Sequence, residues 1–331
     1  MILPGHQEPP QPGAAAPARV LVTGAGGFIG RVLAERLLRD GLAGRPVDRL
    51  TVIDLSLYGM PADPRLHAVE GSIGDAGVLE RALADPVHAV FHLASVPGGA
   101  AEKDPELACR INLGGTLALL DRLRAAGNAP RLVFASTVAV YGAVLPAVVD
   151  EDTPAVPAMS YGAQKLAGEV MIADAARRGW VEACSLRLPG VVARPGDDAG
   201  LVSAFMSRLF WKLRAGEPIT LPVGPAGTAW WISVGACVDN LLHAAGIDTS
   251  AAGPRRVVQM PALHLAISDV VEALARTYGA DRRERVSYAP EPAVERLFAS
   301  FPPLLTPRAQ ALGFRHDGSA EALVRRATQP A

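Results

Sequence analysis

The sequence reads Val20-Leu-Val-Thr-Gly-Ala-Gly-Gly-Phe-Ile-Gly30 at the point that decides its fold. A short β-branched run stops at Thr23, and a helical pattern of apolar residues follows the spaced glycines. Gly24 permits a tight turn, Gly27 lets the backbone approach a pyrophosphate, and Gly30 allows the helix to pack closely on the strand. The N-terminus of that helix offers free N–H groups and a positive dipole end to phosphates. The stretch therefore predicts a strand–loop–helix unit that binds a dinucleotide.

Short apolar runs and helical stretches continue to alternate along the chain. Strands are predicted near 50–55, 90–93, 132–135 and 181–188, with helices near 76–84, 105–126 and 160–178. Further helices, separated by Pro/Gly-rich connections, are predicted near 200–215, 236–246, 267–278 and 319–328. This order predicts an α/β fold, a Rossmann-type doubly wound parallel sheet mainly within 18–195 with a smaller mixed α/β substrate-binding lobe mainly within 196–331. Residues 1–17, rich in Pro, Gly, Gln and Ala, are predicted to form a disordered tail.

An acidic residue, Asp54, ends the second predicted strand. A carboxylate at this place can accept hydrogen bonds from the ribose hydroxyls of adenosine, and its charge would repel a 2′-phosphate. Asp54 therefore predicts NAD as the cofactor in preference to NADP, although Arg31 could in principle meet a phosphate. The structural alternative is that Asp54 merely caps a turn.

A tyrosine and a lysine lie four residues apart in Tyr161-Gly-Ala-Gln-Lys165, on one face of a predicted helix. An ammonium at that distance favours the phenolate, so Tyr161 can exchange protons near neutral pH. Random placement of the chain's tyrosines and lysines would give roughly 0.05 pairs with this spacing. A chance pair in a chain that also carries the glycine loop is therefore improbable. Thr137, just past the end of a strand, is expected to hold the substrate oxygen, and Ser136 is the competing candidate.

Composition excludes several other functions. The formal net charge is −1 with short charge runs, which gives no reason to expect nucleic acid or an anionic membrane as a partner. No apolar run is long enough to span a bilayer, and the N-terminus does not resemble a secretory signal. The seven histidines show no HExxH or paired-ligand pattern, so we expect no metal. The cysteines match no zinc or disulfide spacing, which suits a cytoplasmic location. They are Cys109, Cys184 and Cys237.

Together these motifs resemble the extended short-chain dehydrogenase/reductase superfamily, also called the NAD-dependent epimerase/dehydratase family, from about Arg19 to the C-terminus. The motifs that carry the resemblance are Gly24-x-x-Gly27-Phe-Ile-Gly30, Phe91-His-Leu-Ala94, Asn112-Leu-Gly-Gly-Thr116, Thr137 to Gly142, and Tyr161 with Lys165. The resemblance implies that the catalytic residues are Thr137, Tyr161 and Lys165. It implies cofactor contacts from Gly24, Gly27, Phe28, Ile29, Gly30, Asp54, Ser72, Ile73, Leu93, Ala94, Asn112, Tyr161, Lys165 and Pro189. The family usually has Asp at position 72, so Ser72 would change one adenine contact.

Within the superfamily, four stretches resemble the D-erythronate dehydrogenases, which oxidise a hydroxyl of a four-carbon sugar acid with NAD. They are Leu145 to Pro154, Ser160 to Lys165, Leu186 to Gly196 and Ala311-Leu-Gly-Phe314. Sugar-nucleotide dehydratases follow the catalytic Thr with Asp-Glu, whereas Val138-Ala139 follow Thr137 here. Sugar-nucleotide enzymes also tend to carry Asn where this chain has Pro189. Both differences disfavour a nucleotide-sugar substrate.

The substrate's charge is left open by the sequence. Residues 216–254 contain no arginine or lysine, although a buried carboxylate normally needs a cation. If Arg194, Arg208 or Arg214 reaches the pocket, a sugar acid such as D-erythronate is expected. Otherwise the substrate is a neutral polyol, a lactone or a larger hydroxylated molecule packed against Trp230-Trp231.

Three functions remain, in this order of preference. The first is an NAD-dependent dehydrogenase or reductase acting on a small polar molecule. The second is an epimerase, which returns the hydride within one turnover, and the third is a non-catalytic NAD-binding protein. The resemblance also implies a homodimer formed by the helices near 105–126 and 160–178. Apolar residues beyond one core stripe on these helices fit that state and fit equally well burial inside one subunit; they are Leu117, Leu119, Leu120, Val170 and Met171.

Overall fold

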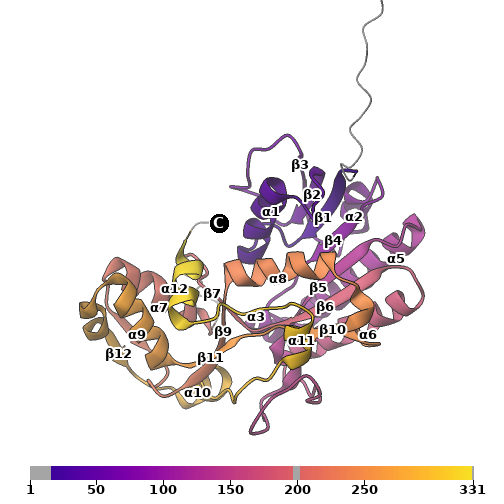
Figure 1. The fold of residues 1–331 in the computed structure, drawn as a ribbon. Helices are drawn as coiled ribbons and strands as arrows, with labels where there is room; N and C mark the ends of the chain where they lie inside the picture. Colours follow the sequence, from indigo (N-terminus) through magenta and orange to yellow (C-terminus); the bar gives the residue numbers. More distant parts are fainter. Residues whose placement is uncertain (1–15, 197–201, 330–331) are drawn as a thin grey trace, which may run out of the picture.

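The structure is a computed structural model that describes residues 16–196 and 202–329. The predicted N-terminal tail therefore lies almost entirely outside the described residues. A large sheet and a smaller lobe make up the described chain (Figure 1).

The large sheet has seven strands in the order β10-β6-β5-β4-β1-β2-β3, and all neighbouring pairs are parallel. Its strands are β1 (Ala18–Thr23), β2 (Val47–Asp54), β3 (Leu66–Glu70), β4 (Ala89–His92), β5 (Arg131–Thr137), β6 (Glu182–Leu188) and β10 (Val257–Gln259). The chain runs outward from β1 to β3 and then crosses back to β4. The order reverses between β1 and β4, and ligands of open α/β sheets bind at such a switch point. The predicted Rossmann-type sheet is confirmed.

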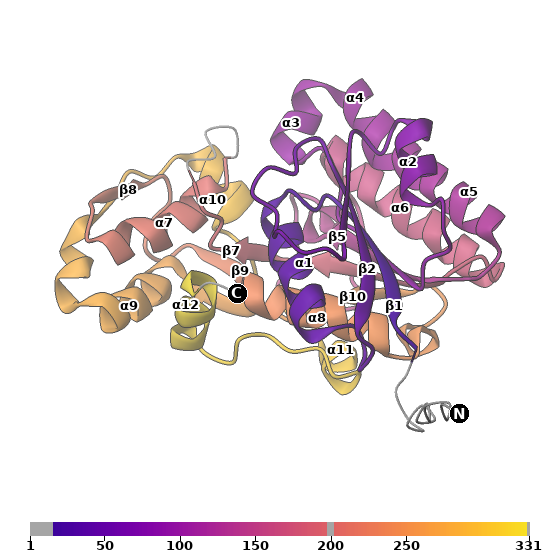
Figure 2. The same cartoon turned by 90° about the horizontal axis from the view of Figure 1, so that it is seen from above.

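Helices cover both faces of this sheet (Figure 2). One face carries α1 (Phe28–Asp40) and α8 (Val234–Gly246), and the other carries α2 (Ala76–Ala82), α5 (Thr116–Ala126) and α6 (Ser160–Arg177). Strand β1 shows why both faces must be covered: Val20 and Val22 pack into the core on the α1/α8 side, and Leu21 packs into the core on the α2/α5/α6 side. Alternate residues of a strand point to opposite faces, so an unbroken apolar run predicts a sheet buried on both.

The smaller lobe is built around a three-stranded mixed sheet in the order β11-β9-β7. Its elements are β7 (Gly190–Val192), α7 (Ala204–Ala215), β8 (Ile219–Leu221), β9 (Thr228–Ser233), β11 (Leu263–Ala266), α9 (Ile267–Tyr278), β12 (Val286–Tyr288), α10 (Pro292–Phe298) and α12 (Ala320–Thr328). Trp230 and Trp231 on β9 are buried, and their indole N–H groups donate to backbone carbonyls of Pro302 and Leu265. Both indoles are therefore core residues of the lobe and offer no open surface to a substrate.

The structure differs from the sequence-based expectations at three places. Strand β3 lacks a continuous apolar run, because most of its residues are exposed at the edge of the sheet. The predicted helix 105–126 is divided into α4 (Pro105–Cys109), a π-helical turn (Arg110–Gly115) and α5. Residues after 196 also return to the large sheet, where they supply α8 and β10.

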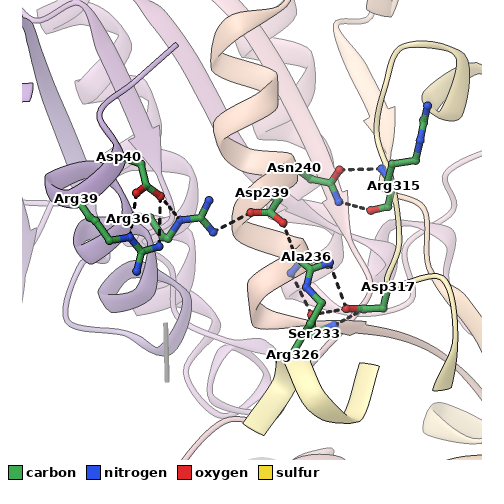
Figure 3. A network of polar contacts seen from close by, with 10 residues as sticks. All are labelled: Arg36, Arg39, Asp40, Ser233, Ala236, Asp239, Asn240, Arg315, Asp317 and Arg326. Carbon is green, nitrogen blue, oxygen red and sulfur yellow. Dashed lines mark hydrogen bonds and ion pairs between the residues drawn. The ribbon is translucent and has the colours of Figure 1, made fainter. Parts of the chain in front are cut away.

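A polar network joins α1, α8 and the C-terminal segment (Figure 3). Asp239 on α8 pairs with Arg36 on α1 at 2.8 Å and with Arg326 on α12. The fully buried carboxylate of Asp317 accepts hydrogen bonds from the backbone N–H and the hydroxyl of Ser233, the residue that caps α8. The network therefore fixes the end of the chain against the helix that supports the large sheet.

Candidate active site

The sequence-predicted site residues lie at the carboxyl ends of adjacent strands. The glycine loop follows β1, Asp54 ends β2, Leu93-Ala94 follow β4, and Thr137 ends β5. The remaining expected cofactor contacts follow the same edge, with Ser72-Ile73 after β3 and Pro189 after β6. One edge of the sheet thus gathers residues that are more than a hundred positions apart in sequence.

The glycine loop is tightly packed. Gly24 has a φ of +74°, and a Cβ there would lie 2.6 Å from the amide nitrogen of Ala94. A Cβ on Gly30 would lie 2.2 Å from the carbonyl oxygen of Gly24. The first turn of α1 can therefore pack this closely on the loop only if residue 30 is glycine. The helix begins after Gly27 with no side-chain cap and no acidic residue in its first turn. Its N-terminus is therefore a suitable cradle for a pyrophosphate.

Asp54 lies directly against the glycine loop. Its Oδ2 accepts a hydrogen bond from the Gly26 N–H at 2.9 Å, and its Oδ1 accepts one from the Leu55 N–H at 2.7 Å. Arg31 donates from Nε to the Gly26 carbonyl at 2.8 Å and from Nη2 to the Tyr58 carbonyl at 2.6 Å. Both side chains thus support the loop, and Gly26 is a contact that the sequence did not single out.

Tyr161 stands in the first turn of α6 beside two hydroxyl side chains. Burial raises the pKa of its phenol, while hydrogen bonds with Ser95 and Thr137 and the charge of Arg194 act to lower it. Thr137 also accepts a hydrogen bond from the Ala139 N–H at 3.2 Å, which fixes its side chain at the end of β5. Ser95, in the loop after β4, is a site residue that the sequence reasoning missed, because a single serine in a loop carries no pattern.

Lys165 is almost fully buried beneath Tyr161. Its Nζ donates a hydrogen bond to the Ala135 carbonyl at 2.8 Å and lies 4.6 Å from the ring centroid of Phe134 and 5.9 Å from that of Tyr161. Burial lowers the pKa of Lys165 to about 7, and the charge of Glu169 opposes that shift. The predicted Tyr–Lys pair is thus brought together on one helix face, with the ammonium under the phenol.

Ser136, the competing candidate for Thr137, points elsewhere. Its hydroxyl donates a hydrogen bond to Oε1 of Glu169 at 2.5 Å, inside the protein. Thr137 contacts the phenol of Tyr161, whereas Ser136 does not lie on that side of the strand. The arrangement favours Thr137 as the substrate-orienting hydroxyl.

A buried histidine, His92, connects the end of β1, just before the glycine loop, to the first residue of α5. The Thr116 hydroxyl donates to the Asn112 carbonyl at 2.7 Å, so it can only accept from Nε2–H of His92 at 2.9 Å. Nδ1 of His92 must then accept from the Thr23 hydroxyl at 2.7 Å. Burial lowers the pKa of His92 to about 3, so the ring stays neutral and keeps this single tautomer.

Asn112 closes the same network. Its Oδ1 accepts from the Val96 N–H at 2.7 Å, and its Nδ2 donates to the Val96 carbonyl at 3.0 Å and to Gln164 on α6 at 2.8 Å. Asn112 therefore positions the loop that carries Ser95. The family resemblance implied that Asn112 contacts the cofactor. In the structure, both amide protons of Asn112 are donated to other residues of the protein.

The three arginines considered for a substrate carboxylate lie in different places. The Arg194 guanidinium carbon lies 5.5 Å from the ring centroid of Phe28, at the start of α1, and its charge acts on Tyr161. Arg208 is exposed on α7, and Arg214 donates to the carbonyl of Thr328 at 2.7 Å. Arg194 is thus the one of the three that lies near Tyr161.

A cavity of about 180 Å³ lies away from this site, at the β10 edge of the large sheet. Buried Tyr141, Arg187 and Gln259 form part of its wall. Tyr141 donates to Gln259 at 3.0 Å, and both amide protons of Gln259 are used by backbone carbonyls. These polar groups are therefore already paired within the protein. In 16–196 and 202–329, no group of His, Cys, Asp or Glu is arranged to hold a metal ion.

Comparison with known proteins agrees with this geometry. The sequence model of the family described as "NAD dependent epimerase/dehydratase family" matches residues 20–256. The chain belongs to this family. It is an oxidoreductase of the extended short-chain type, as the resemblance implied.

The similar proteins include dehydrogenases and an epimerase. The chain is 39% identical to a D-erythronate dehydrogenase of Cupriavidus necator, over 92% of this chain and 96% of that protein. It is 28% identical to a D-erythronate dehydrogenase of Haemophilus influenzae, over 92% and 97%. Among solved structures, a nucleoside-diphosphate-sugar epimerase of Agrobacterium tumefaciens superposes with a TM-score of 0.89 and 32% identity, over 97% of this chain and 96% of that one.

Proposed function

We propose that this protein is an NAD-dependent dehydrogenase that oxidises a hydroxyl of a small sugar acid, D-erythronate or a close relative of it. The observation that carries the proposal is the position of Arg194, a cation beside both Tyr161 and the start of α1. A substrate whose hydroxyl meets Tyr161 would place its carboxylate in the field of that positive charge. The near full-length similarity to two D-erythronate dehydrogenases supports the same substrate class.

The chain's own residues supply the proton chemistry of this reaction. Thr137 would hold the substrate hydroxyl, and Tyr161 as phenolate would accept its proton. The Lys165 ammonium would stabilise the phenolate through space, because the two groups share one helix face in a poorly solvated site. NAD, when bound against the glycine loop and Asp54, supplies the hydride acceptor.

We further propose NAD in preference to NADP, because a 2′-phosphate beside Asp54 would meet a carboxylate. Titration of the purified protein with each cofactor tests this point. Tighter binding of NAD is expected, and equal or tighter binding of NADP would overturn the role given to Asp54.

The role of Arg194 is tested with a matched pair of variants. Arg194→Gln should lower kcat/KM for D-erythronate on the order of 10–100-fold, the usual cost of losing a charge-assisted hydrogen bond. Arg208→Gln removes an exposed arginine from α7 and should change little. Equal effects in both variants would remove Arg194 from the substrate site.

An epimerase is the second candidate, favoured by the similarity to the Agrobacterium tumefaciens enzyme. Release of NADH separates the two functions. A dehydrogenase releases one NADH for each substrate oxidised, whereas an epimerase returns the hydride to its product and accumulates none.

We also propose a cytoplasmic homodimer that pairs α5 and α6 with their copies. Val170 and Met171 on α6 are 62% and 40% exposed, whereas Leu119 and Leu120 on α5 are buried within the subunit. The two α5 leucines therefore belong to the core of the subunit, and Val170 and Met171 supply apolar surface for pairing. No helix in the described part of the chain could cross a membrane. Light scattering at micromolar concentration tests the dimer, and a monomer mass would contradict it.

A further inference from the structure

Beneath the Tyr161–Lys165 pair lies a second charged residue on the same helix face, Glu169. Its Oε1 accepts hydrogen bonds from the Ser136 hydroxyl at 2.5 Å and from Nε of Arg187 at 3.0 Å. Its Oε2 accepts one from Nη2 of Arg187 at 2.8 Å. The side chains of Glu169 and Arg187 are only 3% and 5% exposed. Three donors converge on this carboxylate, and all three come from neighbouring strands of the large sheet.

We propose that Glu169 is a positioning residue that keeps Lys165 charged beneath the active site. The ammonium of Lys165 is held by one neutral acceptor, the Ala135 carbonyl, and two aromatic rings. A buried ammonium with so little compensation tends to lose its proton. Glu169, one helical turn further along α6, supplies the nearby negative charge, and Ser136 and Arg187 hold that charge in place.

The charged groups around Lys165 support this assignment. Tyr161 and Glu169 flank it on α6, and the neutral ring of His92 faces it from β4. Arg187 on β6 is directed at Glu169 in a two-point ion pair. Glu169 is the group whose charge raises the pKa of Lys165 against the effect of burial. Because the site is poorly solvated, a charge one helical turn away acts with little screening.

The inference rests on the proposed function, in which the Lys165 ammonium stabilises the Tyr161 phenolate. Its test does not depend on finding the substrate. The chain contains three lysines, Lys103, Lys165 and Lys212, so a protein labelled with ¹³C at lysine Cε should show three resonances. The shift of each resonance with pH reports the protonation of that lysine, and Lys165→Met identifies the signal of Lys165.

The expected results form a matched set. In Glu169→Gln, the titration midpoint of Lys165 should fall by about one pH unit or more, because the charge is lost and the shape is kept. In Glu169→Asp, which keeps the charge, and in Ser136→Ala, which removes one donor, the midpoint should stay within a few tenths of the wild-type value. A Lys165 midpoint unchanged in a folded Glu169→Gln protein would overturn the proposal.

A second variant guards against failure to fold, since Glu169→Gln leaves the buried Arg187 guanidinium without its ion pair. The double variant Glu169→Gln, Arg187→Gln carries neither charge and should keep the fold. The titration midpoint of Lys165 should still be lower in this double variant than in the wild type. An unchanged midpoint would mean that Glu169 only stabilises the fold, and it would overturn the proposal. If the midpoint falls as expected while D-erythronate and related acids are not oxidised, the positioning role stands and the proposed substrate fails.

Discussion

Two networks of charged side chains in this molecule differ mainly in their contact with water. Asp239 pairs with Arg36 and Arg326 at the surface, where the three side chains are 45%, 24% and 36% exposed (Figure 3). Glu169 pairs with Arg187 in the interior, next to Lys165. Water screens the first network and not the second, so charges of the same kind should contribute very differently to stability and to chemistry. The comparison predicts where a single substitution is tolerated and where it is not.

The largest effect is expected for the turnover of a variant at Tyr161, the proposed proton acceptor next to the interior charges. Tyr161→Phe removes the proton acceptor and keeps the ring, so turnover should fall about 10²–10⁴-fold while NAD binding is nearly unchanged. Stopped-flow or steady-state assays of NADH production measure turnover, and a cofactor titration measures NAD binding. A Phe variant with near-native turnover would remove Tyr161 from the chemistry.

Arg187→Met should cause the next largest change, because it leaves the carboxylate of Glu169 buried without its ion pair. Loss of one partner of a buried pair costs about 3–5 kcal/mol of unfolding free energy. Urea denaturation compared with the wild-type protein gives this value. A loss below about 1 kcal/mol would mean that the interior pair behaves as a surface pair does.

Lys165 should give the folded protein a pH-dependent stability. Burial lowers its pKa from 10.5 to about 7, so between these pH values the unfolded chain binds a proton that the folded chain does not. The free energy of unfolding should therefore rise with pH across this window. Lys165→Met lacks the ionisable group, and its stability advantage over the wild type should shrink as the pH rises from about 7 to about 10. The difference in unfolding free energy between the two proteins is measured by urea denaturation at each pH. A difference that does not change between about pH 7 and about pH 10 would contradict the lowered pKa of buried Lys165.

The smallest effect is expected from Asp239→Asn. It breaks both surface pairs at once, yet exposed pairs contribute about 0–1 kcal/mol each, and salt reduces that further. Denaturation at low and high salt should show a small loss that disappears at high salt. A loss as large as that of Arg187→Met would refute the contrast between the two networks.

Local patterns account for the parts of the fold and the site that the sequence predicted. The glycine loop, Asp54 and the Tyr161–Lys165 pair each lie within a short stretch whose spacing has a direct physical meaning. The parallel sheet followed from apolar runs such as that of β1, which must be covered on both faces.

The parts that were missed depend on contacts between distant residues. Ser95 reaches Tyr161 only because Asn112 holds its loop against α6. Glu169 and Arg187, eighteen positions apart, resemble ordinary charged residues of a helix and a strand until the fold buries them together. Strand β3 was missed because an exposed edge strand has no continuous apolar run.

The most direct test of the account is the oxidation of D-erythronate beside its neutral counterpart, erythritol, at equal concentrations with NAD. The position of Arg194 near Tyr161 predicts that NADH accumulates with the acid and that kcat/KM for erythritol is lower on the order of 10–100-fold or more. Oxidation of erythritol as efficiently as D-erythronate, or of erythritol alone, would contradict the proposed role of Arg194 and the sugar-acid substrate.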